Sequence, residues 1–396
     1  MPDPAAPASS PAPAATAAVH LPLQAASPCK HRLEDHLDPR GLDSGAFVEA
    51  MRGRGVSRPM ALAAYRSWFR EHDAALLARF GATTEARGEI ARTEIEGLTV
   101  KFALRLADGL ESESVVIPMR KRAGGFSRTL CVSSQVGCAM GCRFCETARM
   151  GLLRDLAMEE IVEQWRFARF LVPRTPEERA IGGPAEGHPI RNIVFMGMGE
   201  PMENLDAVLG AIRVLCDRNG PGLAASRIAI STVGRLEGIR RLGTFMQAPG
   251  FRGLGLAVSV NAPNDAVRSE IMPINRAEPI DALFAAIRDF PKRPSAALCI
   301  EYVLIPGVND RLEHCDELCG RLRGLKCSLN VIPYNPRRDS PWPAPEESVV
   351  EAFIGRAIAN GQFVKRRGTK GRDVMGACGQ LGNPELRRSS RRAAST

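Results

Sequence analysis

The sequence predicts an α/β protein whose larger part is a full or partial β/α barrel and whose smaller part is an N-terminal α+β accessory unit. From about residue 128 onward, short apolar segments alternate with amphipathic helical segments, a pattern that favours a parallel sheet with right-handed crossovers. Six or seven such units follow one another, and about 250 residues is a usual length for a β/α barrel. Ahead of them, an alternating and β-branched stretch at 93–118 predicts a β-hairpin.

The chain before the barrel divides into two predicted parts. Residues 1–40 are rich in Ala, Pro and Ser and have too few apolar side chains to offset the entropy of ordering, so we expect a disordered tail. Residues 41–126 are the expected accessory unit. Within it, apolar residues recur at helical spacing over 44–80, and Asp108-Gly109 marks the turn of the hairpin.

The barrel is expected over residues 127–383 and is followed by a second tail, basic and disordered, at 384–396. Its predicted strands are 129–133, 192–198, 227–232, 254–260, 298–305, 327–334 and 362–366. The clearest helix follows the first strand, where Ile161, Trp165 and Ala168 form one apolar face. In β/α barrels the functional side chains lie at the carboxyl ends of the strands, so we expect the site there.

Composition narrows the possible functions. Lys and Arg number 53 against 44 Asp and Glu, and the resulting formal charge of +9 suits a polyanionic partner. Aromatic residues make up 5%, too few for an extended platform that stacks single-stranded bases. No run of about 18 apolar residues exists, which argues against a membrane span. The first 27 residues lack the segments of a secretory signal, and 11 cysteines, an odd number, are unlike a disulfide framework, so we expect a cytoplasmic protein.

Three cysteines directly after the first predicted strand form the sharpest motif. Cys138, Cys142 and Cys145 have the spacing C-x3-C-x2-C. Thiolates so close in one loop can hold three irons of a cubane cluster and leave the fourth iron open to a small molecule. A zinc site or redox-active thiols are the alternatives, but zinc sites usually have a second cysteine or histidine pair at a defined distance, and none follows here. Cys315 and Cys319 lie one helical turn apart and are expected to be packing residues.

Further motifs follow this loop in order. They are CVSSQVGCAMGCRFC, FMGMGEPMENLDAV, ISTVG, APNDAVRSEIMPIN, YVLIPGVND, NVIPYNP and ACGQLG. Together, over about residues 113–381, the sequence resembles the RlmN/Cfr-type RNA adenine methyltransferases of the radical S-adenosylmethionine superfamily. The resemblance implies a partial (β/α)6-type radical-SAM barrel, and it implies methylation of carbon 2 or carbon 8 of an adenine in 23S ribosomal RNA or, in some members, modification of tRNA.

The resemblance also implies roles for individual residues. Cys138, Cys142 and Cys145 would hold a [4Fe-4S] cluster that binds S-adenosylmethionine. The other cofactor-contacting positions all lie at or just past predicted strand ends, where the barrel rule independently expects them. They are Gly199, Glu200, Ser231, Ser259, Val260, Asn261 and Asn335.

The implied mechanism uses two more cysteines and two molecules of S-adenosylmethionine per turnover. Cys378 would accept a methyl group as a thiolate, and a radical from the second cofactor molecule would activate that group for addition to the adenine ring. Glu113 would then accept the ring proton, with neighbouring Glu111 as the competing candidate. Finally Cys131 would attack the Cys378 sulfur, form a transient disulfide and release the methylated base. An electron donor such as flavodoxin or ferredoxin is implied as well.

Basic residues near both ends of the catalytic region are candidates for an RNA-facing surface. They are Arg120, Lys121 and Arg122 before the first barrel strand, and Lys365, Arg366, Arg367, Lys370 and Arg372 before Cys378. A solvated run of charge is the alternative interpretation of such residues.

Three functions remain open at this point. The first is a radical methyltransferase acting on ribosomal RNA, and the second is the same chemistry on tRNA or another RNA. The third is a non-catalytic iron–sulfur protein that binds RNA as a sensor. The two extra thiols distinguish them, because a sensor needs only the cluster cysteines, whereas a methylating enzyme also needs Cys131 and Cys378.

Overall fold

The computed structural model confirms the α/β class and describes residues 37–83, 85–120, 126–181, 190–291, 298–368 and 370–383, which belong to one compact unit. The tails predicted at 1–40 and 384–396 lie almost entirely outside these residues. So do the side chains of Arg120, Lys121 and Arg122. Among the described residues, no helix is long and apolar enough to cross a membrane.

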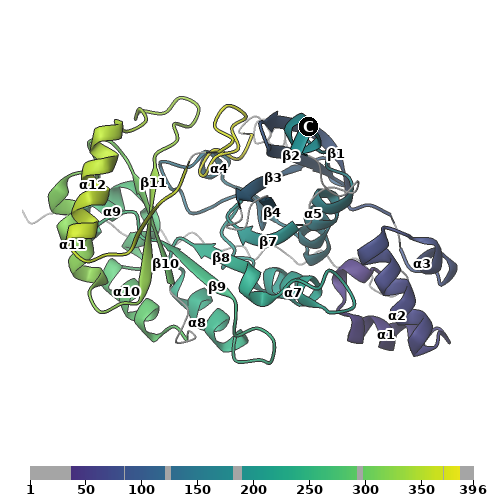
Figure 1. Ribbon diagram of the computed structural model, residues 1–396. Coiled ribbons are helices and arrows are strands. Elements are labelled where there is room, and N and C mark those ends of the chain that lie inside the picture. Colours follow the sequence, from purple (N-terminus) through teal and green to yellow (C-terminus); the bar gives the residue numbers. More distant parts are fainter. Residues whose placement is uncertain are drawn as a thin grey trace, which may run out of the picture. The chain divides into compact units, whose positions relative to one another are not determined.

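A ten-stranded sheet organises the described part of the chain, in the order β1-β2-β3-β4-β7-β8-β9-β10-β11-β12 (Figure 1). From β4 to β12 all neighbours are parallel. These strands are β4 (Phe126–Cys131), β7 (Ile190–Phe195), β8 (Ile228–Thr232), β9 (Gly255–Ser259), β10 (Leu298–Leu304), β11 (Cys327–Pro333) and β12 (Val364–Arg366). All seven predicted barrel strands are therefore confirmed. The sheet ends at β1 and β12 without pairing them to each other, so the barrel is partial.

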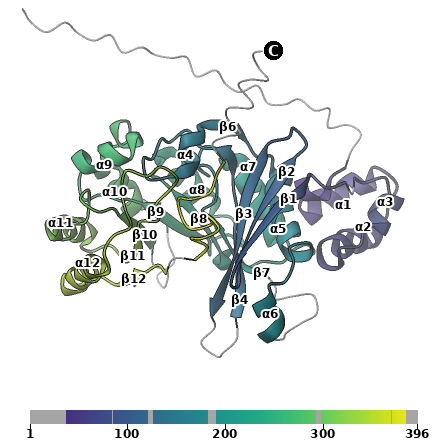
Figure 2. The same cartoon turned by 90° about the horizontal axis from the view of Figure 1, so that it is seen from above.

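The stretch predicted as one hairpin forms three antiparallel strands: β1 (Gly88–Glu96), β2 (Thr99–Leu106) and β3 (Glu111–Arg120). The predicted turn at Asp108-Gly109 joins β2 to β3, and Gly109 has a φ of 79° there. β3 then pairs with β4, from Val115 opposite Cys131 to Arg120 opposite Phe126. The boundary expected at residues 126–127 thus falls where the chain enters β4, inside one continuous sheet that runs from β1 to β12 (Figure 2).

Helices precede the sheet and cover the parallel strands. They are α1 (Ser44–Arg52), α2 (Arg58–Arg66), α3 (Ala75–Arg79), α4 (Glu146–Met150), α5 (Met158–Phe170), α6 (Pro176–Ile181), α7 (Leu205–Cys216), α8 (Leu236–Phe245), α9 (Asp265–Ile271), α10 (Ile280–Asp289), α11 (Leu312–Leu322) and α12 (Glu347–Ala359). Short helical turns lie at Pro39–Gly41, Ser67–Glu71, Ala225–Arg227 and Pro273–Arg276, and a separate two-stranded sheet pairs β5 (Gln135–Gly137) with β6 (Leu152–Asp155). On α11, Cys315 and Cys319 are buried among core residues, as predicted.

The N-terminal helices are joined to the barrel by aromatic packing and by a buried ion pair. The Tyr65 ring packs at a tilt against Phe47 and Phe69, with ring centroids 5.2 and 4.7 Å apart, and the centroids of Phe69 and Trp165 of α5 are 6.4 Å apart. The fully buried Arg40 donates to Glu163 of the same helix at 2.9 Å. Removing one partner of such a pair leaves an uncompensated buried charge, so this contact fixes the helices against α5.

Candidate active site

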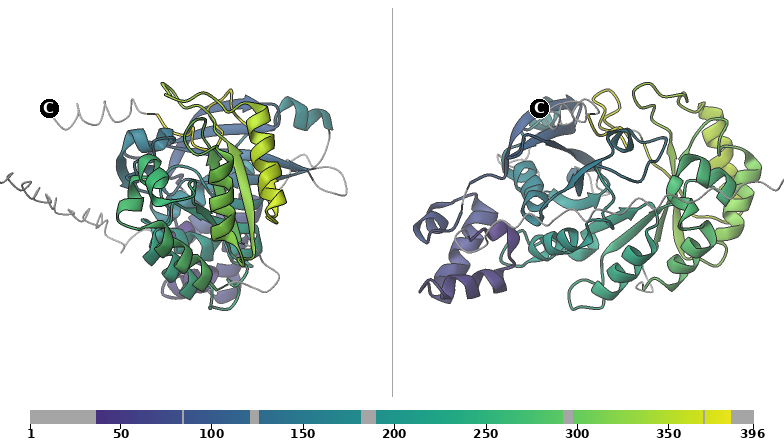
Figure 3. Two further views of the ribbon diagram at one scale, coloured as in Figure 1. Left: turned by 90° about the vertical axis from the view of Figure 1, so that its left-hand side faces the viewer. Right: turned by 180° about the vertical axis from the view of Figure 1, so that it is seen from behind.

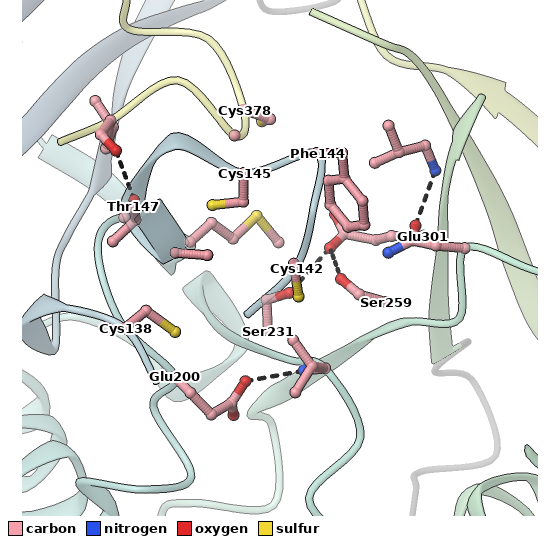
Figure 4. A pocket seen from close by; sticks show the side chains of 18 of the residues that line it. Cys138, Cys142, Phe144, Cys145, Thr147, Glu200, Ser231, Ser259, Glu301 and Cys378 are labelled. Atoms are coloured by element: carbon pink, nitrogen blue, oxygen red, sulfur yellow. Dashed lines mark hydrogen bonds between the residues drawn. The ribbon is translucent and has the colours of Figure 1, made fainter. Parts of the chain in front are cut away.

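A cavity of about 970 Å³, counted with the solvent at its mouth, opens at the carboxyl ends of the parallel strands. Residues from the loops after β5, β7, β8 and β9, from β10 and β11, and from the C-terminal loop line it (Figure 4). Figure 3 shows the ribbon of these strands and loops from two further sides. Nine of the residues predicted from the sequence are among them. They are Cys138, Cys142, Cys145, Gly199, Glu200, Ser231, Ser259, Asn261 and Cys378.

The three-cysteine loop runs from the end of β5 to the start of α4. It leaves β5 at Gly137, which has a φ of 79°, and a Cβ there would come within 1.9 Å of the Gly151 carbonyl oxygen. Only glycine permits this approach, which brings Cys138 N–H to donate to Gly151 O at 3.0 Å. The loop then turns, because Cys145 N–H donates to Cys142 O at 3.1 Å. All three sulfurs consequently face one cavity.

These thiols have the donor chemistry of a polynuclear iron–sulfur site. Burial and the neighbouring thiols raise the pKa of Cys142 well above its usual value, and burial raises the pKa of Cys138 to about 12. A metal supplies the positive charge that stabilises buried thiolates. Among the described residues, no three His, Cys, Asp or Glu side chains converge closely enough for one metal ion. A cubane binds each thiolate on a different iron, and three thiols that line one cavity are a donor set that fits it.

Gly199 and Glu200 form the next wall of the cavity. Gly199 has a φ of 101°, and a Cβ there would lie 2.6 Å from Cβ of Gln135. The Glu200 carboxylate is 2% exposed and accepts from the backbone N–H groups of Met202, at 3.1 Å, and Val233, at 2.9 Å (Figure 4). Burial raises the pKa of Glu200 to about 7. A buried carboxyl group of this kind is suited to a ligand that brings an ammonium group.

Glu301 of β10 was not predicted, yet it connects two predicted residues. Ser231 Oγ and Ser259 Oγ donate to its Oε2 at 2.9 and 3.3 Å (Figure 4). Its other oxygen, Oε1, accepts from Arg367 Nη1 at 3.1 Å. The sequence did contain a signal, because Glu301 is the one charged residue in the otherwise apolar strand LCIEYVLI. A charged residue in a buried strand needs a partner of opposite charge. Here that partner is Arg367, which lines the same cavity.

The three other predicted cofactor positions differ in whether they line the cavity. Asn261 lines the cavity with a φ of 56°, and its Oδ1 accepts from Val303 N–H at 2.9 Å. Val260 is fully buried beside it, and its N–H donates to the Glu301 carbonyl at 3.1 Å. Asn335 is not a lining residue, and its Nδ2 lies 3.5 Å from the Cys378 carbonyl oxygen. It therefore contacts the C-terminal loop rather than the cavity.

Cys378 reaches the cavity from a C-terminal loop that is tied to the cluster loop. Glu146 N–H donates to the Gly379 carbonyl at 2.7 Å, and Thr147 Oγ1 donates to the Leu381 carbonyl at 2.6 Å. Both bonds come from α4, which directly follows Cys145. The loop that carries Cys378 is thus held against the loop that carries the three cysteines (Figure 4).

Cys131 ends β4 and is 6% exposed. Burial and the nearby Cys378 raise its pKa to about 12, while the charge of Arg367 and the backbone N–H of Met196 act in the opposite direction. Cys131 and Cys378 are both free thiols, as are all the cysteines among the described residues.

Glu113 lies on β3 and is 3% exposed, so it is not a solvated strand charge. Its carboxylate pairs with Arg92 at 3.0 Å and Lys101 at 3.2 Å, and accepts from Gly382 N–H at 2.8 Å. The competing Glu111 pairs with Arg92 and, at 3.5 Å, with Arg105. Glu113 is therefore the candidate that is bonded to the loop of Cys378.

The basic side chains before Cys378 do not all point to the same side of the protein. Lys365 and Arg366 are exposed, and Arg366 pairs with Glu347 of α12 at 2.7 Å. Lys370 donates to the Pro118 carbonyl at 2.5 Å. Arg367 instead turns into the cavity. Arg367 therefore lies in the cavity with Glu301 and not on the outer surface with Arg366, and contact of these basic residues with RNA stays a prediction.

Comparisons with known proteins agree with this geometry. The profile of the radical SAM superfamily matches residues 132–319. The "Probable dual-specificity RNA methyltransferase RlmN 1" of Protochlamydia amoebophila is 46% identical over 300 residues, which are 76% of this chain and 77% of that protein. The "Probable RNA methyltransferase sce1580" of Sorangium cellulosum is 44% identical over 297 residues, 74% and 68% of the two chains. The crystal structure of a radical SAM methyltransferase from Sphaerobacter thermophilus is 34% identical, with a TM-score of 0.75, covering 87% of this chain and 99% of that one.

Proposed function

We propose that this chain, which belongs to the RlmN family of the radical SAM superfamily, methylates a ring carbon of an adenine in RNA. The first candidate substrate is 23S ribosomal RNA. The observation that carries the proposal is that Cys378 shares one cavity with the three-cysteine loop. A sensor that only binds a cluster would not need this additional thiol, so the arrangement favours the enzyme.

Cys138, Cys142 and Cys145 would hold the [4Fe-4S] cluster, and Gly199, Glu200, Ser231, Ser259 and Asn261 would line the place of S-adenosylmethionine. Val260 and Asn335 would support this wall from outside the cavity, Val260 next to Asn261 and Asn335 against the loop of Cys378. When bound, these groups would supply methyl from one cofactor molecule and, by reductive cleavage of a second, a 5′-deoxyadenosyl radical. Two cofactor molecules would thus be used per turnover. The reducing electron would come from a protein such as flavodoxin or ferredoxin, which suits a cytoplasmic enzyme.

Three side chains of the protein would carry out the remaining steps of the reaction. Cys378, as a thiolate, would form the new sulfur–carbon bond and carry the carbon unit to the ring. Glu113, held by two cations and the Gly382 N–H, would accept the ring proton. Cys131, as a thiolate, would then attack the Cys378 sulfur to form a transient disulfide. The electron pair of the broken carbon–sulfur bond would leave with the carbon, which takes up a proton and so becomes the methyl group of the released base. An external thiol reductant would return the disulfide to two thiols.

A second candidate substrate is tRNA or another RNA. The Protochlamydia relative is named a dual-specificity enzyme, which favours testing both RNAs. Mass spectrometry of nucleosides from ribosomal RNA and tRNA, in a deletion strain and its parent, separates these possibilities. The loss of a methyladenosine from either RNA supports the proposal, and identical nucleosides in both strains would refute it.

The role of the two thiols has a direct test. We expect Cys131→Ala to stall as a covalent protein–RNA adduct that survives denaturing electrophoresis, because nothing resolves the thioether. We expect Cys378→Ala to form no adduct, because it has no acceptor for the carbon unit. Free RNA with both variants would contradict the proposed mechanism.

A further inference from the structure

One face of the antiparallel strands β1, β2 and β3 carries charged side chains, among them the proposed base Glu113. In the register of the sheet, Lys101 of β2 lies opposite Glu94 of β1 and opposite Val115 of β3. Residues two apart in a strand share a face, so Glu113, two residues before Val115, lies on the same face as Lys101. Arg105, four residues after Lys101, lies there as well. The proposed base is thus surrounded by cations to which the proposed reaction gives no part.

The C-terminal loop covers this face. Gly382 N–H donates to Glu113 Oε2 at 2.8 Å. A Cβ at Gly376 would lie 3.6 Å from Cβ of Lys101, which is ordinary van der Waals contact. Cys378 lies between these two glycines in the chain. Lys101 and Glu113 therefore lie under the loop that carries the proposed methyl acceptor, Lys101 beneath the segment before Cys378 and Glu113 beneath the segment after it.

Two cations pair with Glu113, and they differ in burial. Lys101 Nζ lies 3.2 Å from Glu113 Oε1, and the two side chains are 4% and 3% exposed. Arg92 Nη2 lies 3.0 Å from the same oxygen, but this side chain is 38% exposed and also pairs with Glu94 and Glu111. Solvent and salt screen a buried pair much less than an exposed one. Lys101 is consequently the cation on which the charge of Glu113 depends most.

The two oxygens of Glu113 have different neighbours. Oε1 faces Lys101 and Arg92 on the side of the strands, whereas Oε2 accepts from Gly382 N–H on the side of the loop. Charge-assisted contacts on both oxygens hold the carboxylate in one orientation. The ion pair with Lys101 thus keeps Oε2 turned toward the loop of Cys378.

We propose that Lys101 is a positioning residue that keeps Glu113 ionised and aimed at the loop of Cys378. This inference rests on the proposed function, in which Glu113 accepts the ring proton. In that step the carbon–hydrogen bond of the substituted ring carbon breaks, its electron pair stays in the ring, and the proton passes to a carboxylate oxygen. A buried carboxyl group without a counter-charge favours its neutral form, and the neutral form cannot take up this proton.

The first test observes the ionisation of Glu113 directly, without RNA or S-adenosylmethionine. Infrared spectra of anaerobic holoenzyme are recorded at about pH 7.5, where ordinary carboxyl groups are ionised. The spectrum of Lys101→Met is compared with that of the double variant Lys101→Met/Glu113→Gln. A carbonyl band of a neutral carboxyl group that the second substitution removes belongs to Glu113, because all other carboxyl groups, Glu200 included, are common to both proteins.

We expect this band with Lys101→Met and also with Lys101→Gln, which keeps a hydrogen-bond donor but no charge. The parent, Lys101→Arg and Arg105→Met should show none when each is compared with its own Glu113→Gln form. Arg105→Met is the matched control, since it removes a cation from the same face of β2 that pairs with Glu89 and Glu111. A band already present in the parent, or none in either neutral variant, would overturn the inference.

The second test measures the rate of methyladenosine formation in a double-mutant cycle. Lys101→Met should slow the reaction by about tenfold or more, and Lys101→Arg should recover much of the rate. The double variant Lys101→Met/Glu113→Gln should be no slower than Glu113→Gln alone, because Lys101 acts through that carboxylate. A merely structural role predicts that the two effects multiply, and multiplied effects would overturn the inference.

Failure of the proposed function would look different. The parent protein would then form no methyladenosine in ribosomal RNA or tRNA, while the infrared band of Glu113 would still depend on the charge at position 101. Conversely, a parent that methylates RNA, together with a Lys101→Met variant that is as fast as the parent and shows no band, would leave the methyltransferase standing and remove the positioning role of Lys101.

Discussion

A methyl group added at Gly199 should damage the cofactor side of the cavity. The residue has a φ of 101°, and a Cβ there would lie 2.6 Å from Gln135 Cβ and 2.8 Å from Gln135 N. The left-handed backbone costs about 1–2 kcal/mol with a side chain present, and forcing apart backbone and side-chain atoms costs about 1–3 kcal/mol more. Gly199→Ala should therefore lose about 2–5 kcal/mol of unfolding free energy.

Gly250→Ala separates these two costs. Gly250 has a similar φ of 92°, but a Cβ there meets nothing within 4 Å. It should therefore lose only the backbone part, about 1–2 kcal/mol. The difference between the two variants isolates the clash with Gln135.

Urea unfolding of the two variants and the parent, followed by circular dichroism, gives the free energies. Titration with S-adenosylmethionine then measures the site itself. Because Gln135 Oε1 accepts from Glu200 N–H at 2.8 Å, displacing Gln135 should also move Glu200, so Gly199→Ala should bind the cofactor at least about tenfold more weakly. Equal destabilisation in both variants, with normal cofactor binding by Gly199→Ala, would refute the reasoning.

Three further outcomes follow from the site. Anaerobically prepared protein should contain about four irons per chain, and Cys142→Ser should lose most of them; metal analysis that finds zinc alone would contradict this. Glu113→Gln should slow formation of methyladenosine by about 100-fold, while Glu111→Gln, its neighbour, should change the rate by less than about threefold; equal effects would remove the distinction between them. Burial raises the pKa of Cys131 to about 12, so in the unsubstituted protein its alkylation should rise about tenfold per pH unit between about pH 7.5 and 9.5, and a plateau in that range would show that its pKa is not raised.

The parallel strands were predictable because each is an apolar run between helical segments. β8 (Ile228–Thr232) and β9 (Gly255–Ser259) fall within the segments that the pattern marks. The pairing of β3 with β4 was not predictable in the same way. Each strand can be predicted from its own residues, but its partner cannot. The pairing has a definite register, with Val115 opposite Cys131, and the periodicity of one strand does not specify which strand it pairs with or in which register.

Some residues of the candidate site could also be predicted from the sequence, and others could not. The three-cysteine loop was predictable because its ligands lie within eight residues of sequence, and Cys378 was singled out by resemblance to a family. Glu301 was missed because both faces of β10 are covered: Glu301 lines the cavity, while its neighbours Ile300 and Tyr302 are buried in the core. The single charge in this apolar strand was a signal that it needs a partner, but it did not identify Arg367 as that partner, because the contact joins distant parts of the chain.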